Sequence, residues 1–531
     1  MTIDAAPELE RPQDSTRITP GGLLRRRARQ SPEALALLDP PNRRTLSPSA
    51  PRRLTYAEAD LAVDALASYF LELGLLAGDR IVVQLPNFAE MPLALLGAWR
   101  AGLTVAAIPM LWRATEIARV CDALEPLALI GMSRYAEERP TELLRDVAAT
   151  RLSVRFVFGF GSDLPKGVSS LDEAIFDGAR PGVIPRASAG PTLITFTARA
   201  GAPLVPLFRR EDDILLQGAM TVMSLSLDRH DILLNAYPLT GPVGIGAGLA
   251  PWLIAGNALV QHEPFDYAVL AQQLLSTGAT ATALPGSILN QLETDGILED
   301  AQCRLRHKGR VWSPPQLSEP PTRSLLEDRA SFDLYPLGDL ACVIVRGPSK
   351  GDRQALPLGA VHISDGEEGT DFLETALING ADNGAQDIAI RGPVVPYGRI
   401  KCPAARDADD FVKTGLLGEI CEGRLRVCRN PELVYHGGFT IAASELDGLY
   451  QAFPGFLDAA CFVLPDPVVG DRIFAAVAPT PSAPVSLDAL HSFLTERGIA
   501  PYKFPDKLLV VPDIPRGDVG EILRGHILQG L

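Results

Sequence analysis

Two side chains near the middle of the chain are candidates for chemistry, Asp339 and Cys342 in the stretch Asp-Leu-Ala-Cys. A carboxylate oxygen can bind a hard cation such as Mg²⁺, and an Asp that follows Gly338 can equally cap a turn. A thiolate is a nucleophile, but a reactive Cys needs an exposed, electropositive site. The neighbours Leu340 and Val343 indicate a buried strand, so we expect the thiol of Cys342 to be inert.

A second candidate is the run from Asn235 through Ala236 to Tyr237, which a glycine-rich stretch follows. Glycine allows a flat ring or an acyl chain to approach the backbone closely. The alternative is that these glycines only allow a helix to pack tightly. The residues concerned are Gly241, Val243, Gly244 and Gly246.

The elements that must position these residues follow from hydrophobic periodicity. Apolar residues at helical spacing alternate with short apolar, β-branched runs, and this pattern predicts parallel sheets with helices on both faces. The predicted helices are 54–74, 89–101 and 116–124, and the predicted strands are 79–85, 103–109, 127–131, 231–236, 258–261 and 279–284.

The pattern changes after about residue 339, where short β-like runs alternate with Gly, Pro and Asp. The final hundred residues combine two helical stretches with two strands. The sequence therefore predicts an α/β protein with a large domain over 1–428 and a small α+β lid domain over 429–531. Within the large domain we expect α/β subdomains at 1–190 and 191–340 and a β-rich subdomain at 341–428.

Composition limits the function classes. The 531 residues carry 49 Lys and Arg against 64 Asp and Glu, so the net charge is −15, which argues against a nucleic-acid partner. No apolar run reaches the length of a membrane span, and the start MTIDAAPELERPQD is not a secretory signal. The seven cysteines show no paired spacing, which indicates reduced thiols in a cytoplasmic protein. The seven histidines are scattered and form no HExxH motif, so we expect no zinc site.

Five segments carry a resemblance to a known family. They are DRIVVQLPNFAE (79–90), NAYPLTGPVGIGAG (235–248), RGPVVPYGRIK (391–401), LPDPVVGDR (464–472) and YKFPDKLLVV (502–511). Together they resemble the adenylate-forming superfamily, most closely the stand-alone aryl acid adenylating enzymes of siderophore-type secondary metabolism. The resemblance implies activation of a carboxylate by Mg-ATP, then transfer to the pantetheine thiol of an aryl carrier protein or to CoA, with rotation of the lid between the steps.

The phosphate-binding loop of the family, TSGTTGxPK, corresponds to FTARAGAPL (196–204). Of the loop's hydroxyls, glycines and lysine, this chain keeps Thr197 and Gly201 and has Leu204 where the family has Lys. Arg199 either supplies a replacement charge or lies solvated on a surface turn.

The other nucleotide motifs are altered as well. The resemblance places Ser313-Pro314-Pro315-Gln316 at the stretch that contacts adenine and Asp339 at the Mg²⁺ carboxylate. The ribose-binding TGD motif is Thr414-Gly415-Leu416, and a leucine cannot accept hydrogen bonds from ribose hydroxyls. Use of ATP and Mg²⁺ is therefore doubtful, and no cofactor is assigned.

The hinge motif of the family becomes Arg429-Asn430-Pro431-Glu432, in which proline fixes one backbone angle near the pivot. The catalytic lysine near the C-terminus becomes Glu521, which reverses the charge that the reaction needs, and Arg516 or Arg524 is a candidate for compensation. Lys503 is kept, with a structural role in the family.

The altered motifs leave three hypotheses. The chain acts on an aryl or acyl thioester, bound to a carrier protein or CoA, without ATP. Alternatively, it is a non-catalytic scaffold that binds a carrier protein or partner enzyme, or it is a working ligase with substitute residues. The resemblance implies an aromatic-sized pocket at the segment from Asn235 to Tyr237. In aryl acid enzymes an Asn at the position of Ala236 binds the ortho-hydroxyl of the acid, so the sequence gives no support for salicylate-type recognition. Whether the chain is an enzyme stays open.

Overall fold

The computed structural model describes residues 18–176, 192–318, 331–346, 358–362, 371–378, 384–396, 409–421, 424–481 and 486–529, together with Gly190 and Leu356. Two expectations fall wholly or partly outside these ranges. They are the N-terminal stretch 1–14, for which the sequence predicts no secretory signal, and residues 397–401 of the third family segment.

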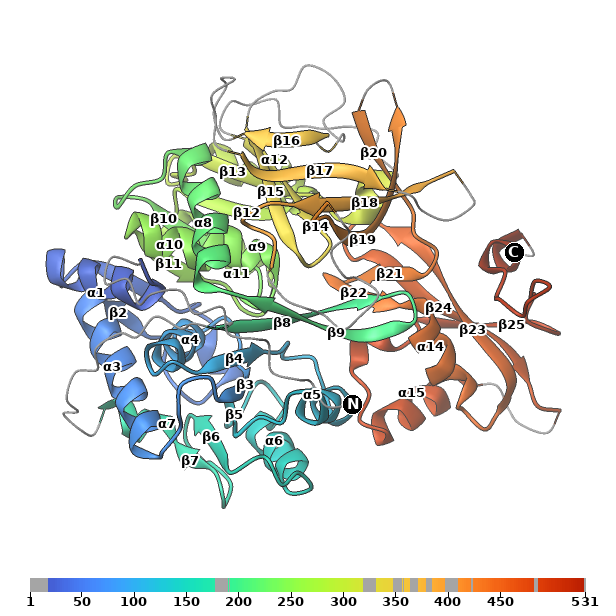
Figure 1. The fold of residues 1–531 in the computed structure, drawn as a ribbon, viewed down its shortest axis with the longest axis horizontal. Helices are drawn as coiled ribbons and strands as arrows, with labels where there is room; N and C mark the ends of the chain where they lie inside the picture. The colour runs from blue at the N-terminus through green and yellow to red at the C-terminus, as the bar shows by residue number, and fades with distance from the viewer. Residues whose placement is uncertain are drawn as a thin grey trace.

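A seven-stranded sheet forms the lower part of the molecule (Figure 1). Its strand order is β7-β6-β5-β3-β4-β8-β9, and every pair is parallel except the terminal β8–β9 hairpin. The helices around it include the 17-residue α3 (Tyr56–Glu72), which begins at a capping box formed by Thr55 and Glu58. The strands are β3 (Arg80–Gln84), β4 (Thr104–Ala107), β5 (Ala128–Met132), β6 (Phe156–Phe160), β7 (Ser169–Ser170), β8 (Leu193–Arg199) and β9 (Ala202–Arg209).

An eight-stranded sheet lies above it, in the order β15-β14-β13-β12-β10-β11-β1-β2. The six inner strands are parallel, and β2 and β15 close the two edges antiparallel. The strands are β1 (Leu35–Leu38), β2 (Arg53–Thr55), β10 (Ile232–Asn235), β11 (Ala258–Gln261), β12 (Ala281–Pro285), β13 (His307–Val311), β14 (Ser331–Leu337) and β15 (Ala341–Arg346).

Helices cover the faces of both sheets, as apolar parallel strands require. A large shared core includes the fully buried Trp99 and Trp252, which come from helices that pack beside different sheets. The helices are α1 (Pro20–Gln30), α2 (Arg43–Leu46), α3 (Tyr56–Glu72), α4 (Glu90–Arg100), α5 (Ala114–Leu124), α6 (Pro140–Ala148), α7 (Leu171–Phe176), α8 (Glu211–Leu225), α9 (Pro242–Gly244), η1 (Ile245–Leu249), α10 (Ala250–Ala255), α11 (Tyr267–Ser276), α12 (Gly286–Thr294), η2 (Ile297–Glu299) and α13 (Pro314–Ser318).

A separate antiparallel sheet of five strands follows, at the top of Figure 1. Its strands are paired in sequence order, and its apolar face shares a core with β14 and β15. The strands are β16 (Gly359–His362), β17 (Asp371–Ile378), β18 (Gln386–Arg391), β19 (Val412–Cys421) and β20 (Arg424–Cys428).

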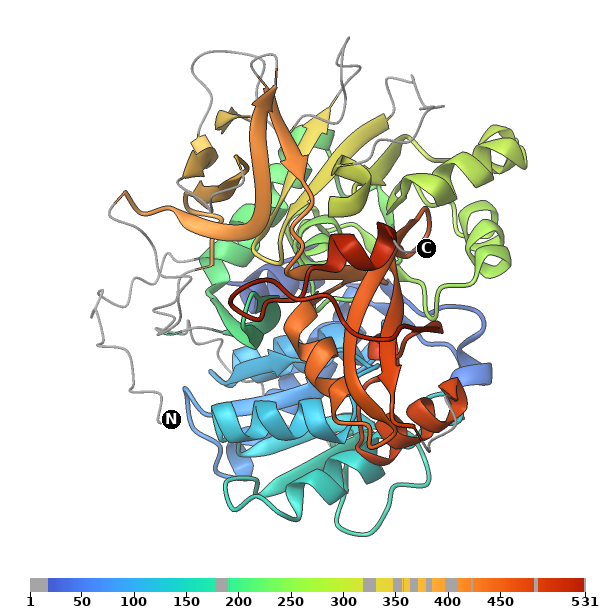
Figure 2. The ribbon, with the colours of Figure 1, turned by 90° about the vertical axis from the view of Figure 1, so that its right-hand side faces the viewer.

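The C-terminal part, which we call the lid, has its own sheet and its own core. It lies beside both the β8–β9 hairpin and α5, and Figure 2 shows it from the front. Its elements are β21 (Leu433–His436), β22 (Phe439–Ala442), α14 (Ala443–Gln451), β23 (Phe456–Asp466), β24 (Gly470–Pro479), α15 (Leu487–Glu496), η3 (Pro501–Lys503), β25 (Lys507–Val510) and α16 (Arg524–Gln529).

The predicted fold class is confirmed: a large part with two mostly parallel, helix-covered sheets and a β-rich addition precedes a small α+β lid. The sheets interleave along the chain, because β1 and β2 join the second sheet while β8 and β9 join the first. The proposed domain limits stay predictions. No helix among the described residues is long and apolar enough to cross a membrane.

Candidate functional site

The segment that matches the phosphate loop is a tight hairpin. Strand β8 ends at Arg199, which is paired with Ala202 on β9, so only Ala200 and Gly201 form the turn. Gly201 has a φ of 69°, a left-handed conformation that glycine adopts without strain. Leu204, at the position of the family's lysine, packs on the apolar cluster beneath the hairpin.

The polar side chains of the hairpin form a hydrogen-bonded chain that ends at Asp339. The hydroxyl of Thr197 donates to the Asp339 carboxylate at 2.5 Å. The Arg199 guanidinium donates to the Thr197 hydroxyl at 3.0 Å and to the carbonyl of Lys413 at 3.4 Å. The interpretation of Arg199 as a solvated surface residue is therefore wrong, because the fold brings β19 against the hairpin.

Arg209, which the sequence did not single out, holds the turn that carries Asp339. It is buried and donates to the main-chain carbonyls of Asp339 and Leu340 at 2.5 and 2.8 Å. Burial lowers its pKa to about 10, although Asp213 and Asp339 oppose that shift. The sequence feature that could have pointed to Arg209 is the pair Arg209-Arg210 at the end of an apolar strand.

The surroundings of the Asp339 carboxylate do not suit a Mg²⁺ ion. Burial raises its pKa, and hydrogen bonds from Thr197 and from Thr440 of the lid, with the charges of Arg199 and Arg209, act in the opposite direction. Two guanidinium groups repel a divalent cation, and the carboxylate already accepts hydrogen bonds from two hydroxyls. No cluster of three or more His, Cys, Asp or Glu suited to a metal occurs among the described residues.

The stretch at the position of the ribose-binding motif, Thr414-Gly415-Leu416, lies in the protein interior at Thr414 and Leu416. Leu416 is 1% exposed and belongs to the core shared with β14 and β15. The Thr414 hydroxyl donates to the carbonyl of Ile388 at 2.7 Å and accepts from the amide of Leu416 at 3.1 Å. The motif therefore serves packing and turn formation.

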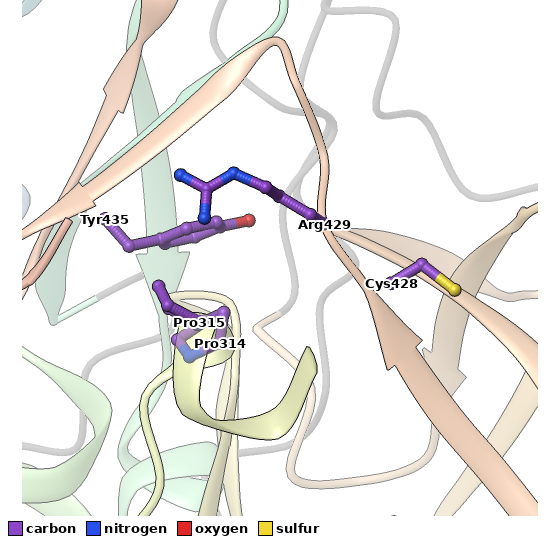
Figure 3. Close-up of a pocket in the computed structure, with 5 residues that line it drawn as sticks. All are labelled: Pro314, Pro315, Cys428, Arg429 and Tyr435. Carbon is purple, nitrogen blue, oxygen red and sulfur yellow. The ribbon is translucent and has the colours of Figure 1, made fainter. Parts of the chain in front are cut away.

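A very small cavity, of about 10 Å³, lies where the hinge meets the adenine-type stretch. Its lining includes Pro314, Pro315, Cys428, Arg429 and Tyr435, and Figure 3 shows the ring of Tyr435 between the Arg429 guanidinium and the two prolines. Sites for drug-sized ligands have volumes of roughly 300–1,000 Å³. The slot beside the Tyr435 ring is thus far too small for a drug-sized ligand.

The hinge is bonded on both sides. Arg429 pairs with the buried Asp471 at 2.6 Å, and Asp471 also accepts from the amide of Tyr435 at 2.9 Å. Asn430 donates to the carbonyl of Gly415 at 2.9 Å.

Two hinge residues face solvent. Pro431 and Glu432 are exposed, and the Glu432 carbonyl accepts from Ala443 at the start of α14.

The charge reversal near the C-terminus lies on the surface. Glu521 is exposed, and its side chain folds over Gly517. Arg516 pairs with Asp458 at 2.9 Å and Arg524 with Asp447 at 2.6 Å, both inside the lid. In this arrangement neither arginine replaces the missing lysine.

The predicted acyl segment begins with a buried asparagine. Asn235 donates to the carbonyl of Tyr237 at 2.9 Å and to Gln261 at 2.8 Å. Ala236 and Tyr237 are half-buried, and burial raises the pKa of the Tyr237 phenol, with Cys342 adding to the shift. The structure therefore brings Tyr237 and Cys342 together, although they lie 105 positions apart in the sequence.

The glycines after this segment have different roles. A Cβ at Gly244 would lie 2.2 Å from the carbonyl oxygen of Pro238, and one at Gly246 would lie 2.8 Å from Gln217. At Gly241 the nearest atom would be 4.0 Å away. Tight packing, the alternative to a ligand-facing role, accounts for the first two.

Cys342 is buried as the sequence indicated. Its backbone is held by Gln217, which donates to the carbonyl at 2.7 Å and accepts from the amide at 3.1 Å. Burial raises the pKa of its thiol, so it is not a nucleophile in this fold.

The chain is similar in sequence to several known proteins. The AMP-binding enzyme family matches residues 24–187. The chain is 26% identical to a 2-hydroxy-7-methoxy-5-methyl-1-naphthoate–CoA ligase of Streptomyces carzinostaticus, over 94% of this chain and 91% of the relative. It is also 26% identical to a salicyl-AMP ligase / salicyl-S-ArCP synthetase of Mycobacterium tuberculosis, over 95% of this chain and 89% of the relative.

Solved structures share the fold. An o-succinylbenzoate CoA synthetase of Bacillus subtilis superposes with a TM-score of 0.73 at 19% identity, covering 96% of this chain and 98% of that one. The amide bond synthetase McbA of Marinactinospora thermotolerans superposes with a TM-score of 0.76 at 16% identity, covering 97% of this chain and 100% of that one. The resemblance seen in the sequence is confirmed.

Proposed function

We propose that this chain, a member of the adenylate-forming superfamily, has lost ATP-dependent adenylation and acts on a preformed aryl or acyl thioester. One observation carries the proposal: the groups at the nucleotide site are bonded to one another. Thr197 and Asp339 share a hydrogen bond, Arg199 is bonded to Thr197, and the ring of Tyr435 lies against the adenine-type stretch.

The electrostatics support the loss of the first step. Formation of an acyl-adenylate brings a carboxylate and a triphosphate together, so the reaction needs positive charge aimed at both. This chain has Leu204 and Glu521 at the two lysine positions, and its nearby Arg209 is directed at main-chain carbonyls. Binding Mg-ATP would require these contacts to be broken.

The substrate class follows from the relatives and the predicted acyl segment. The relatives are named for naphthoate and salicylate acids and for their transfer to CoA or to an aryl carrier protein. They align with nearly the whole chain, which supports a thioester of an aromatic or acyl acid with a carrier protein or CoA as the ligand. Tyr237 is the aromatic residue we expect beside the acyl group.

Calorimetry with Mg-ATP is the direct test. We expect no saturable heat with Mg-ATP and no acid-dependent pyrophosphate exchange, because the site's own side chains occupy it. The proposal is supported if Tyr237→Ala lowers a thioester-dependent activity. The control variant Leu457→Ala, at an exposed leucine outside the acyl segment, should keep that activity. Saturable Mg-ATP binding together with pyrophosphate exchange would refute it and restore an ordinary aryl or acyl acid ligase.

A scaffold role is the second candidate, and the burial of Cys342 favours it. The one nucleophile that the sequence suggested has a raised pKa and lies in the core. A scaffold would form a stable complex with a carrier protein, seen by size-exclusion chromatography, and would leave every loaded form of that carrier unchanged. Turnover of any loaded form would exclude this role.

A further inference from the structure

A buried ion cluster joins the lid to the large part of the chain. Lys503, on the lid, places its ammonium 2.9 Å from Glu116 of α5 and 3.0 Å from Glu445 of α14. The exposed fractions of these three side chains are 5%, 4% and 6%. Arg119 adds a second positive charge at 2.6 Å from Glu445, so two carboxylates face two cations.

Main-chain hydrogen bonds surround this cluster and cross the same interface. The amide of Thr115 donates to the carbonyl of Gly498 at 3.1 Å, and its hydroxyl donates to the carbonyl of Arg497 at 2.6 Å. The amide of Ala500 donates to the Glu116 carboxylate at 3.3 Å. The start of α5 is therefore bonded to the lid through backbone and side chains together.

Aromatic packing and a second polar contact extend the attachment toward the hairpin. Tyr502 stacks on Phe439 at 4.2 Å between ring centroids and also packs on the cluster that contains Trp112. Thr440, next to Phe439 on β22, bonds to the Asp339 carboxylate. The lid thus contacts the large part at α5, at the hairpin and at the bonded hinge.

We propose that Glu116 and Lys503 form a lock that holds the lid in this single orientation on α5. Turning the lid about its hinge would take Lys503 away from Glu116 and break the three backbone and hydroxyl contacts beside it. Lys503 would keep Glu445, which lies on the lid with it, whereas Glu116 would exchange the ammonium and the Ala500 amide for water. The docked arrangement is therefore favoured by these charge-assisted contacts together with the hydrogen bonds of Thr115. The inference is independent of the proposed function, since it concerns the attachment of the lid and makes no claim about ATP or thioesters.

Hydrogen exchange of the full-length protein tests the lock, because the amides of Thr115 and Ala500 donate across the interface. In Glu116→Gln and Lys503→Met we expect both amides to exchange at least about tenfold faster. Undocking separates the Ala500 amide from the charged Glu116 carboxylate and the Thr115 amide from the carbonyl of Gly498. The amides of β23, in the lid core, should keep their protection. The matched control is Lys413→Met, which removes a lysine paired with Asp387 at 2.6 Å within the five-stranded sheet and should leave both interface amides unchanged.

The proposal is overturned if Thr115 and Ala500 exchange at the wild-type rate in Glu116→Gln while β23 stays protected. If the amides of β23 also exchange faster in Lys503→Met, the lid itself has lost structure in that variant. The result for Glu116→Gln then tests the lock, because Glu116 belongs to α5 and not to the lid. Small-angle scattering gives a second readout: we expect Glu116→Gln to become more extended than the wild type, and an unchanged profile in that variant would also count against the lock. The outcome leaves the calorimetric test of the proposed function untouched.

Discussion

Leu416 gives the sharpest test of the site, because the family places an aspartate there. The side chain is 1% exposed and lies in the core that joins β14, β15 and the five-stranded sheet. Truncation of a buried leucine to alanine costs about 2–5 kcal/mol, through lost transfer free energy and the cavity left behind. The nearly complete burial leads us to expect about 3 kcal/mol or more for Leu416→Ala.

Leu416→Asp restores the family's residue and should be worse than alanine. The aspartate loses the same apolar contacts and in addition places a carboxylate among leucines and valines, which costs several kcal/mol more unless the group takes up a proton. We therefore expect Leu416→Asp to be strongly destabilised and to gain no affinity for Mg-ATP. Leu457→Ala, on a leucine that is 71% exposed, is the matched control and should change the free energy of unfolding by less than about 0.5 kcal/mol.

Urea unfolding followed by tryptophan fluorescence measures these differences, and Trp312 belongs to the same core as Leu416. The reasoning fails if Leu416→Ala is as stable as the wild type. It also fails if Leu416→Asp folds with wild-type stability and shows saturable heat with Mg-ATP, because the position would then face a nucleotide.

Three further predictions concern charge and packing. Burial raises the pKa of Asp339, so the folded state holds that proton more firmly than the unfolded state. This group's contribution to stability is present at low pH and is lost as pH rises through the folded pKa. Asp339→Asn should flatten that part of a stability profile measured by urea unfolding upward from about pH 4, where an ordinary aspartate titrates. Gly244→Ala should lower the melting temperature because of the 2.2 Å approach, whereas Gly241→Ala, with 4.0 Å of room, should not, and equal melting temperatures would contradict the packing role. Arg524→Met removes a largely buried ion pair and should lower the free energy of unfolding by about 3 kcal/mol or more. Arg516→Met removes a more exposed pair and should lower it by about 1 kcal/mol or less. Thermal unfolding compares the two variants, and the reverse order would show that burial does not determine how much each ion pair contributes to stability.

Much of the architecture could be predicted from local pattern. The apolar runs around Val82, Val105 and Leu129 became adjacent parallel strands, because such residues need cover on both faces. Membership of β8 and β9 in the first sheet was missed, since strand order is set by contacts between distant segments. The sequence offered a turn at Arg199 as one of two alternatives, and the tight hairpin itself depends on the pairing of Arg199 with Ala202.

The sequence by itself determined which groups are present: no lysine at Leu204 or Glu521, no ribose-binding carboxylate at Leu416, and a net charge of −15. Only the tertiary structure decided where the remaining polar groups point. Thr197 and Asp339 are 142 residues apart, and Glu116 and Lys503 are 387 apart. Hydrogen bonds and ion pairs of this kind form only when folding removes the competing water and brings both partners within about 3 Å, so their pairing is a property of the fold and not of either segment.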